Sequence, residues 1–493
     1  MGAAAGPAAA GQAAPETVAT GPGVVQVVAT GSARSLGEPA AAGDASVSAV
    51  AATSFGAAGA LAEVWTRRAS AARWIPAGSV LPAGFGSSYD ASAAASSSGP
   101  LLVVAGTAPP GESCITNGSV AIANVGSAGR LGPARLVSDQ RGTGSFDDRP
   151  AVAIGPDATV WVAWSQGPDS DACQDVGTGD RIEVAASHDG GRTFGRPVPM
   201  PADGGQSAFG VRLAPLPAGR VAVSWTETMR GGDEAVLLSV LGPGRRLAGP
   251  SEVLTGDGMP LVLPGASFYD FPAGDIAALP GNALVVAAPF WRSGHGVIKL
   301  AIGTPGGQWL TSVVSPPAGA DLLLPALGVL SADEVRLLCA VHTRSEDRLG
   351  YDWANVRVNG AGAGTLSAGL APLTPAPAGP GFFEIGEELS MAWTPAGLLS
   401  SVVVAGRAGA TLEMATLATP LPAATPRGKA TSARPASATS PGPAHGTASG
   451  RSVGARQPGA ATVAVWVAGG LLFCAVVLAS WLAWRRRSGR PAG

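Results

Sequence analysis

Ser187-His188-Asp189-Gly190-Gly191-Arg192-Thr193-Phe194 has the chemistry of a tight β-hairpin. The Asp189 carboxylate can accept hydrogen bonds from backbone N–H groups inside the turn, and Gly191 tolerates a positive φ. Phe194 then begins the next strand and is expected to pack inward. This stretch therefore predicts a hairpin between two antiparallel strands.

The spacing Ser-x-Asp-x-Gly-x-Thr-aromatic resembles the Asp-box of the bacterial neuraminidase repeat. It is carried by Ser187, Asp189, Gly191, Thr193 and Phe194. The resemblance implies a diverged sialidase-like β-propeller, in which the Asp-box belongs to a four-stranded blade and lies away from the catalytic pocket. A glycine-rich hairpin of no particular family is the alternative. The motif thus indicates a fold and leaves activity open.

Repetition along the chain supports a propeller more strongly than the single motif does. An apolar strand, a polar or Gly/Pro turn and a second apolar strand recur at intervals of roughly 45 to 60 residues, near the blade length of propellers. The copies predict an all-β propeller of about seven blades, with six as the alternative because sialidases usually have six. They are Ala49–Trp65, Ser92–Gly106, Ala151–Trp164, Val211–Trp225, Ile276–Trp291, Ala326–His342 and Leu389–Val404.

The N-terminal stretch Val24–Gly43 is similar to the hairpin around the Asp-box, with Leu36 where Phe194 stands and without the aspartate. It is expected to be an orphan outer hairpin that completes the last blade beside Thr411–Ala418. Completing that blade closes the ring and leaves no open sheet edge. A disordered leader is the alternative.

Composition favours an all-β body and excludes some classes of function. The 493 residues include Gly 71 and Pro 42, which supply turns for many short strands. The formal net charge of −2 gives no basic face for nucleic acid. No cofactor is expected, because no Gly-rich loop joins a strand to a helix. No metal is expected either, since no ligand spacing relates the four histidines, His188, His295, His342 and His445.

The residues after the propeller change in character and predict a membrane anchor. Residues 461–484 carry no charge and are long enough to cross a bilayer core of about 30 Å as a helix. Arginines follow at once, which predicts a cytoplasmic tail and an extracytoplasmic propeller in a single-pass protein of the cell membrane that contacts lipid through this helix. The expected segments are a disordered stretch 1–23, the propeller 24–418, a Pro/Ala/Ser/Thr-rich stalk 419–460, the transmembrane helix 461–484 and a basic tail 485–493.

An exported propeller needs a leader, and residues 1–23 have neither a basic residue nor a continuous apolar core. Translation is therefore expected to start upstream. The alternative, a tail-anchored propeller in the cytoplasm, violates the charge rule.

Two cysteines predict a disulfide. Cys114 and Cys173 each fall in the long loop after the second strand of neighbouring blades. Equivalent loops on adjacent blades lie side by side, so a bridge is expected, with two free loop thiols as the alternative. Cys339 lies in an apolar strand, where a small buried thiol is the ordinary interpretation.

The resemblance to sialidases implies an arginine triad, a tyrosine nucleophile activated by a glutamate, and an aspartate acid/base. Only weak candidates match: Arg149-Pro150 is similar to the family's Arg-Ile-Pro motif without the isoleucine, and Tyr351 lies outside the repeated blade starts. Arg212 and Arg344 are further arginines for the triad. Glycoside hydrolysis also needs two opposed carboxylates, which the spacing does not show. A catalytic role is therefore not favoured, and a membrane-tethered exo-sialidase or related glycosidase stays as the alternative.

An aromatic residue followed by an acid recurs at four blade starts. In a propeller the chain begins each blade near the central channel, so the acids are expected to point toward one opening suited to a cation or a sugar. Turn-capping acids are the alternative. The predicted function is a non-catalytic, membrane-anchored binding or scaffolding module at the bacterial cell surface, with a glycan or cell-envelope ligand. The predicted ligand-binding acids are Asp90, Asp147, Asp270 and Glu384.

Overall fold

The computed structural model describes strands and loops that lie within Met1–Thr425. The described residues are 18–19, 24–31, 35–56, 59–96, 99–111, 116–169, 180–201, 205, 207–229, 232–242, 250–260, 262–266, 273–358, 364–366, 371–374, 389–394, 397–406 and 409–417.

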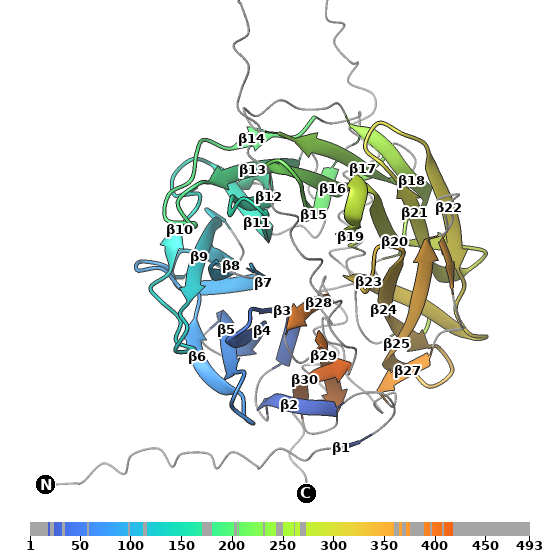
Figure 1. The fold of residues 1–493 in the computed structure, drawn as a ribbon, viewed down its shortest axis with the longest axis horizontal. Coiled ribbons are helices and arrows are strands. Elements are labelled where there is room, and N and C mark those ends of the chain that lie inside the picture. The colour runs from blue at the N-terminus through green and yellow to red at the C-terminus, as the bar shows by residue number, and fades with distance from the viewer. Residues whose placement is uncertain are drawn as a thin grey trace, which may run out of the picture. The chain divides into compact units, whose positions relative to one another are not determined.

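Four-stranded antiparallel groups surround a common centre in this unit (Figure 1). In the described residues there are seven such blades, and each begins with the strand nearest the centre. Blade 1 is β3 (Ser35–Gly43), β4 (Val47–Gly56), β5 (Gly59–Arg68) and β6 (Ile75–Ser79). Blade 2 is β7 (Ser87–Ala95), β8 (Leu101–Ala108), β9 (Ser119–Val125) and β10 (Arg135–Leu136). Blade 3 is β11 (Ser145–Ile154), β12 (Val160–Pro168), β13 (Arg181–Ser187) and β14 (Val198–Pro199).

The remaining blades follow the same order. Blade 4 is β15 (Ser207–Leu216), β16 (Arg220–Thr228), β17 (Asp233–Leu241) and β18 (Ser251–Asp257). Blade 5 is β19 (Asp275–Ala278), β20 (Leu284–Arg292), β21 (His295–Gly303) and β22 (Trp309–Val314). Blade 6 is β23 (Ala320–Val329), β24 (Glu334–Thr343) and β25 (Arg348–Val358), with β26 (Gly364–Leu366) and β27 (Ala371–Thr374) both paired to β25. Blades 4 and 5 share one eight-stranded sheet, because Asp257 of β18 pairs with Trp291 of β20.

The last blade is closed by the N-terminal part of the chain. It consists of β28 (Ser390–Thr394), β29 (Gly397–Gly406), β30 (Gly409–Leu417) and β2 (Val24–Gly31), with β1 (Val18–Ala19) paired to β2. β2 runs antiparallel to β30, from Val24 opposite Thr416 to Gly31 opposite Ala410. The expected outer strand of the last blade is therefore present. The rest of the expected orphan hairpin is different, because β3 is the inner strand of blade 1.

This assignment also corrects the alignment of the first repeat. Ala49–Trp65 covers β4 and β5, the second and third strands of blade 1, whereas the other copies cover first and second strands. The two patterns look alike in sequence because every strand here is an apolar run between turns.

Apolar side chains fill the space between neighbouring blades and explain why the strands read as continuous apolar runs. β8 is buried along its whole length, since one face packs on blade 1 and the other on blade 3. Among the residues that the structure describes, seven buried clusters lie between successive blades, and one of them joins Leu36 and Trp65 of blade 1 to Leu399 and Leu412 of blade 7. The ring is thus held by blade-to-blade burial on every side.

The fold prediction needs one correction, which concerns its C-terminal transmembrane helix. In the part of the chain that the structure describes, no helix is long and apolar enough to cross a membrane. The apolar runs there are short strands that neighbouring blades bury on both faces, as in β8. The expected helix 461–484, the stalk and the basic tail lie outside the described residues. The described fold is therefore all-β.

The inner strands share an irregularity that positions the candidate site. Each register shift inserts a bulge whose first residue has a positive φ, with values of 54° at Glu38, 49° at Asp90 and 51° at Arg149. Blades 4 and 6 repeat it at Gly210 and Leu324. Non-glycine residues rarely adopt this conformation, so the surrounding packing holds it against a local cost of about 1–3 kcal/mol each.

Candidate functional site

The bulges of blades 1 to 3 gather charged and polar side chains from three consecutive inner strands. Tyr89 is the centre of this group, because four carboxylates act on its phenol electrostatically. We call the group the inner-strand cluster; it consists of Glu38, Tyr89, Asp90, Asp147, Asp148 and Arg149.

Glu38 ties blade 1 to blade 2. Its side chain is 2% exposed and accepts hydrogen bonds from Thr53 Oγ1 at 2.5 Å and from the backbone N–H of Asp90 at 2.9 Å. A carboxylate that receives a backbone N–H from the next blade fixes the bulge of that blade. Glu38 therefore positions the cluster, with both of these contacts made inside the protein.

Asp147 is buried but well satisfied. It accepts hydrogen bonds from Gln140 Nε2 at 3.0 Å and from Gln166 Nε2 at 2.8 Å. Burial raises the pKa of Asp147, and these hydrogen bonds oppose the rise. Gln166 Oε1 in turn accepts from Arg181 Nη2 at 2.5 Å, so the network extends toward the outer strands of blade 3.

Tyr89 and Asp148 differ from these two acids because each keeps a buried atom without a hydrogen-bond partner. Tyr89 is 8% exposed and Asp148 is 7% exposed. Among the described residues, Tyr89 Oη and Asp148 Oδ1 have no partner. Burial raises the pKa of Tyr89 well above its usual value, and the charges of Asp148, Asp90, Asp147 and Glu38 raise it further. The phenol is therefore a protonated donor beside an acceptor carboxylate.

The ring of Tyr89 has room because Gly106 stands opposite it on β8. A Cβ at Gly106 would come within 2.5 Å of the ring. The absence of a side chain there is thus required for the position of the phenol.

Arg149 brings a cation to the cluster. Its Nε lies 3.8 Å from Asp148 Oδ2, and its side chain is 14% exposed. The bulge conformation at Arg149 turns this side chain away from the regular alternation of β11. Four carboxylates and one guanidinium leave the cluster negative in total.

The structure brings together two of the four acids predicted from blade starts. Asp90 and Asp147 both belong to the inner-strand cluster, but they are not equivalent: Asp90 is the first bulge residue of blade 2, and Asp147 lies two residues before that position in blade 3. Asp270 and Glu384 lie outside the described residues. Sequence reasoning missed Glu38 and Asp148, although Glu38-Pro39 and Arg149-Pro150 share a bulge signal.

The catalytic candidates suggested by the family resemblance lie on different blades. Tyr351 is on β25, the third strand of blade 6, where it is 2% exposed and packs with Leu323 and Leu338. Arg149 is on the inner strand of blade 3. Two blades separate them along the ring. This arrangement does not place Tyr351 as a nucleophile beside Arg149 as the residue that binds the substrate carboxylate.

The other two arginines have partners of their own. Arg344 donates from Nε and Nη2 to Asp321 at 2.7 and 2.5 Å, beside the buried His342. Arg212 donates to the carbonyl oxygen of Val211 at 2.8 Å and acts electrostatically on Asp275. Each belongs to a structural network between blades, which gives no sign of a shared carboxylate site.

The Asp-box forms a hydrogen-bonded turn between β13 and β14. Asp189 accepts from the backbone N–H groups of Arg192 and Thr193 at 2.8 and 2.9 Å and from Thr193 Oγ1 at 2.6 Å. Ser187 Oγ donates to Asp189 at 2.7 Å, and Gly191 has φ 79°. Phe194 packs against the cluster between blades 2 and 3. This turn is at the opposite end of blade 3 from Asp147, so its role there is structural.

The cysteine predictions fall mostly on undescribed residues. Cys114 and Cys173 lie outside the described part of the chain. Cys339 is a free, fully buried thiol, and burial raises its pKa far above the ordinary value. Among the described residues, no group of three or more His, Cys, Asp or Glu side chains is arranged to hold a metal ion.

Comparison with known proteins shows similarity in fold. The chain matches no protein-family model and no curated protein sequence. It resembles the solved structure of an ulvan lyase bound to -[GlcA(1-4)Rha3S]-, with 10% identity, TM-score 0.50, and coverage of 80% of this chain and 96% of that chain. A Dyadobacter fermentans protein of unknown function gives 13% identity, TM-score 0.47, and coverage of 66% and 93%. A Hadza microbial sialidase gives 11% identity, TM-score 0.43, and coverage of 72% and 73%. At these identities the likeness concerns the fold alone, which is consistent with the predicted sialidase-like propeller.

Proposed function

We propose that the protein is a glycan-binding propeller whose ligand site is the inner-strand cluster of blades 1 to 3. The observation that carries the proposal is the pair of unsatisfied buried atoms, Tyr89 Oη and Asp148 Oδ1. Such atoms cost about 1–3 kcal/mol each unless a ligand or water completes them. A sugar hydroxyl accepts from a phenol and donates to a carboxylate, so it satisfies both atoms at once.

The charge of the cluster supports a neutral polyhydroxyl ligand rather than an anionic one. Glu38, Asp90, Asp147 and Asp148 repel a further carboxylate, and Arg149 is the single guanidinium in the group. A sialic acid carboxylate held by three arginines does not suit this composition. The ulvan lyase that resembles this chain was solved bound to -[GlcA(1-4)Rha3S]-, so a related fold accommodates a saccharide.

A glycoside hydrolase is the second candidate, and one observation favours it. Burial raises the pKa of Asp147, while Asp148 on the next residue lies beside Arg149. Two carboxyl groups in different environments are the usual basis for dividing acid and base roles. In that case Asp147→Asn abolishes hydrolysis of an aryl glycoside by the purified protein, whereas the binding proposal expects no hydrolysis by the wild-type chain.

A glycan array followed by titration of the bound glycan tests the proposal. The wild-type chain should bind a set of neutral glycans. Asp148→Asn should weaken the affinity about 10-fold to 100-fold, because it removes a charged acceptor, and Tyr89→Phe about 5-fold to 10-fold. Asp233→Asn on β17 is the control, since Asp233 is exposed and lies in blade 4.

Two results would overturn the proposal. One is a wild-type chain that binds no glycan on the array. The other is binding that Asp148→Asn and Tyr89→Phe leave at the wild-type affinity, provided that circular dichroism shows both variants folded.

A further inference from the structure

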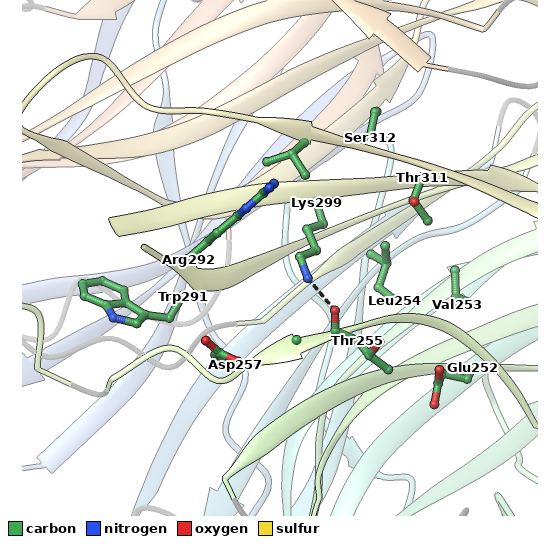
Figure 2. Close-up of a pocket in the computed structure, with 12 residues that line it drawn as sticks. Glu252, Val253, Leu254, Thr255, Asp257, Trp291, Arg292, Lys299, Thr311 and Ser312 are labelled. Atoms are coloured by element: carbon green, nitrogen blue, oxygen red, sulfur yellow. Dashed lines mark hydrogen bonds between the residues drawn. The ribbon is translucent and has the colours of Figure 1, made fainter. Parts of the chain in front are cut away.

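A polar groove lies between blades 4 and 5, away from the inner-strand cluster. It has a volume of about 400 Å³ and is lined by β18 on one side and by β20, β21 and β22 on the other. Figure 2 shows Trp291 at one end and Lys299 reaching across to Thr255 of β18. Ligand pockets for whole small molecules have about this volume.

Lys299 is held in the middle of the groove. Its ammonium lies 4.5 Å from the centre of the Phe290 ring and donates to the carbonyl oxygen of Thr255. Gly256 makes this position accessible, because a Cβ there would collide with Nζ of Lys299. An ammonium group has three N–H donors. The hydrogen bond to Thr255 uses one of them, so the others can donate to a ligand.

Arg292 adds a second cation to the same groove. Burial lowers the pKa of Lys299, the nearby charge of Arg292 lowers it further, and Asp257 offsets part of the effect. Among the described residues, no carboxylate oxygen lies within the 4.0 Å ion-pair distance of either cation. Two close cations without an ion pair favour an anionic group between them.

The walls of the groove offer many further hydrogen bonds. β18 pairs along Ser251–Asp257 with β17, but on its other side it pairs with β20 through Asp257 alone. The backbone groups of this open edge line the groove, and Thr311 supplies a hydroxyl from the face of β22 that Lys299 shares. Many small donors and acceptors around two cations match a ligand with several hydroxyls and an oxyanion.

We propose that this groove binds the oxyanion of an acidic saccharide, a carboxylate or a sulfate, between Lys299 and Arg292. The inference goes beyond the proposed function, because the site lies on different blades and selects an anionic saccharide rather than a neutral one. Thr311 binds a sugar hydroxyl beside the two cations.

Isothermal titration of the full chain tests the inference with defined probes. The probes are tetragalacturonate, its carboxyl-reduced neutral analogue, a sulfated tetrasaccharide and inorganic sulfate. At low salt, at least one of the two acidic tetrasaccharides should bind about 10-fold or more tightly than the neutral analogue. The carboxylate and sulfate probes distinguish the two oxyanions.

Variants locate the binding. Lys299→Met should weaken the acidic tetrasaccharide about 10-fold, and Arg292→Gln should weaken it less but measurably. Arg292 is exposed, so Arg292→Gln should fold normally. This variant therefore still tests the groove if loss of Lys299 disturbs the fold. Arg192→Gln, an exposed arginine on the Asp-box turn, is the matched control and should bind like the wild type.

The proposals for the two sites can be rejected independently of each other. Asp148→Asn should leave binding in the groove unchanged, so loss of glycan-array binding alone rejects the inner-strand site and not the groove. The groove proposal is rejected if neither acidic tetrasaccharide binds more tightly than the neutral analogue. It is also rejected if Lys299→Met and Arg292→Gln bind like the wild type, or if inorganic sulfate binds as tightly as the acidic tetrasaccharides.

Discussion

Buried carboxylates in this protein differ in how far their neighbours satisfy them. Glu38 receives a hydroxyl and a backbone N–H from two blades, whereas Asp148 keeps one oxygen without a partner among the described residues. Glu234 is 8% exposed, and its carboxylate accepts a hydrogen bond from the backbone N–H of Met259. The cost of burying an acid thus depends on the donors around it.

Glu234 makes stability depend on pH. Burial raises its pKa from 4.5 to about 7, so the folded protein binds this proton more tightly than the unfolded chain does. The contribution is full below about pH 4.5 and is lost as pH rises through about 7. Glu234→Gln should therefore raise the free energy of unfolding by about 1–3 kcal/mol at pH 8 and change it little at pH 5.

Urea denaturation at the two pH values checks this expectation, with Asp233→Asn as the exposed neighbouring control. An equal effect of Glu234→Gln at pH 5 and pH 8 would show that burial does not shift the titration of this carboxyl group.

At the scale of the element, the inner-strand bulge is what brings residues of different blades together. The apolar repeats predict the strands, and the start of each blade predicts acids near the centre. The bulge shifts the register, so Asp90 and Asp147 occupy different positions although their sequence contexts look alike. The unsatisfied atoms of Tyr89 and Asp148 depend on packing between blades, which a pattern within one strand does not encode. The Asp-box turn could be predicted, because the hydrogen bonds that Asp189 accepts all come from residues within the motif.

The bulge conformation can be tested at Arg149, where φ is 51°. Glycine adopts a positive φ without a steric cost, whereas a β-branched residue does not. Arg149→Val should therefore be less stable than Arg149→Gly by about 1–2 kcal/mol in denaturant unfolding. Equal stabilities of the two variants would mean that β11 has no such bulge in solution.

At the scale of the whole molecule, the described strands form a ring whose ends meet in one blade. β2 closes the last blade by pairing with β30, and Leu36 and Leu412 lie in the same apolar cluster. The first and last parts of the propeller are therefore held together by both hydrogen bonds and burial. A closed ring also leaves no unpaired strand at the join, which limits aggregation.

Deletion of residues 24–31 tests this closure. Loss of β2 should lower the Tm and expose the edge of β30, so the variant should self-associate. Scanning calorimetry and size-exclusion chromatography with light scattering measure the two effects. An unchanged Tm together with a monodisperse monomer would contradict the role of β2 in closing the ring.

A crystal structure of the wild-type chain with a glycan selected from the array would show whether Tyr89 and Asp148 hold a sugar hydroxyl. We expect a hydroxyl oxygen within hydrogen-bond distance of both Tyr89 Oη and Asp148 Oδ1, which are buried and have no partner among the described residues. A glycan bound elsewhere, with both atoms contacting only water, would contradict it.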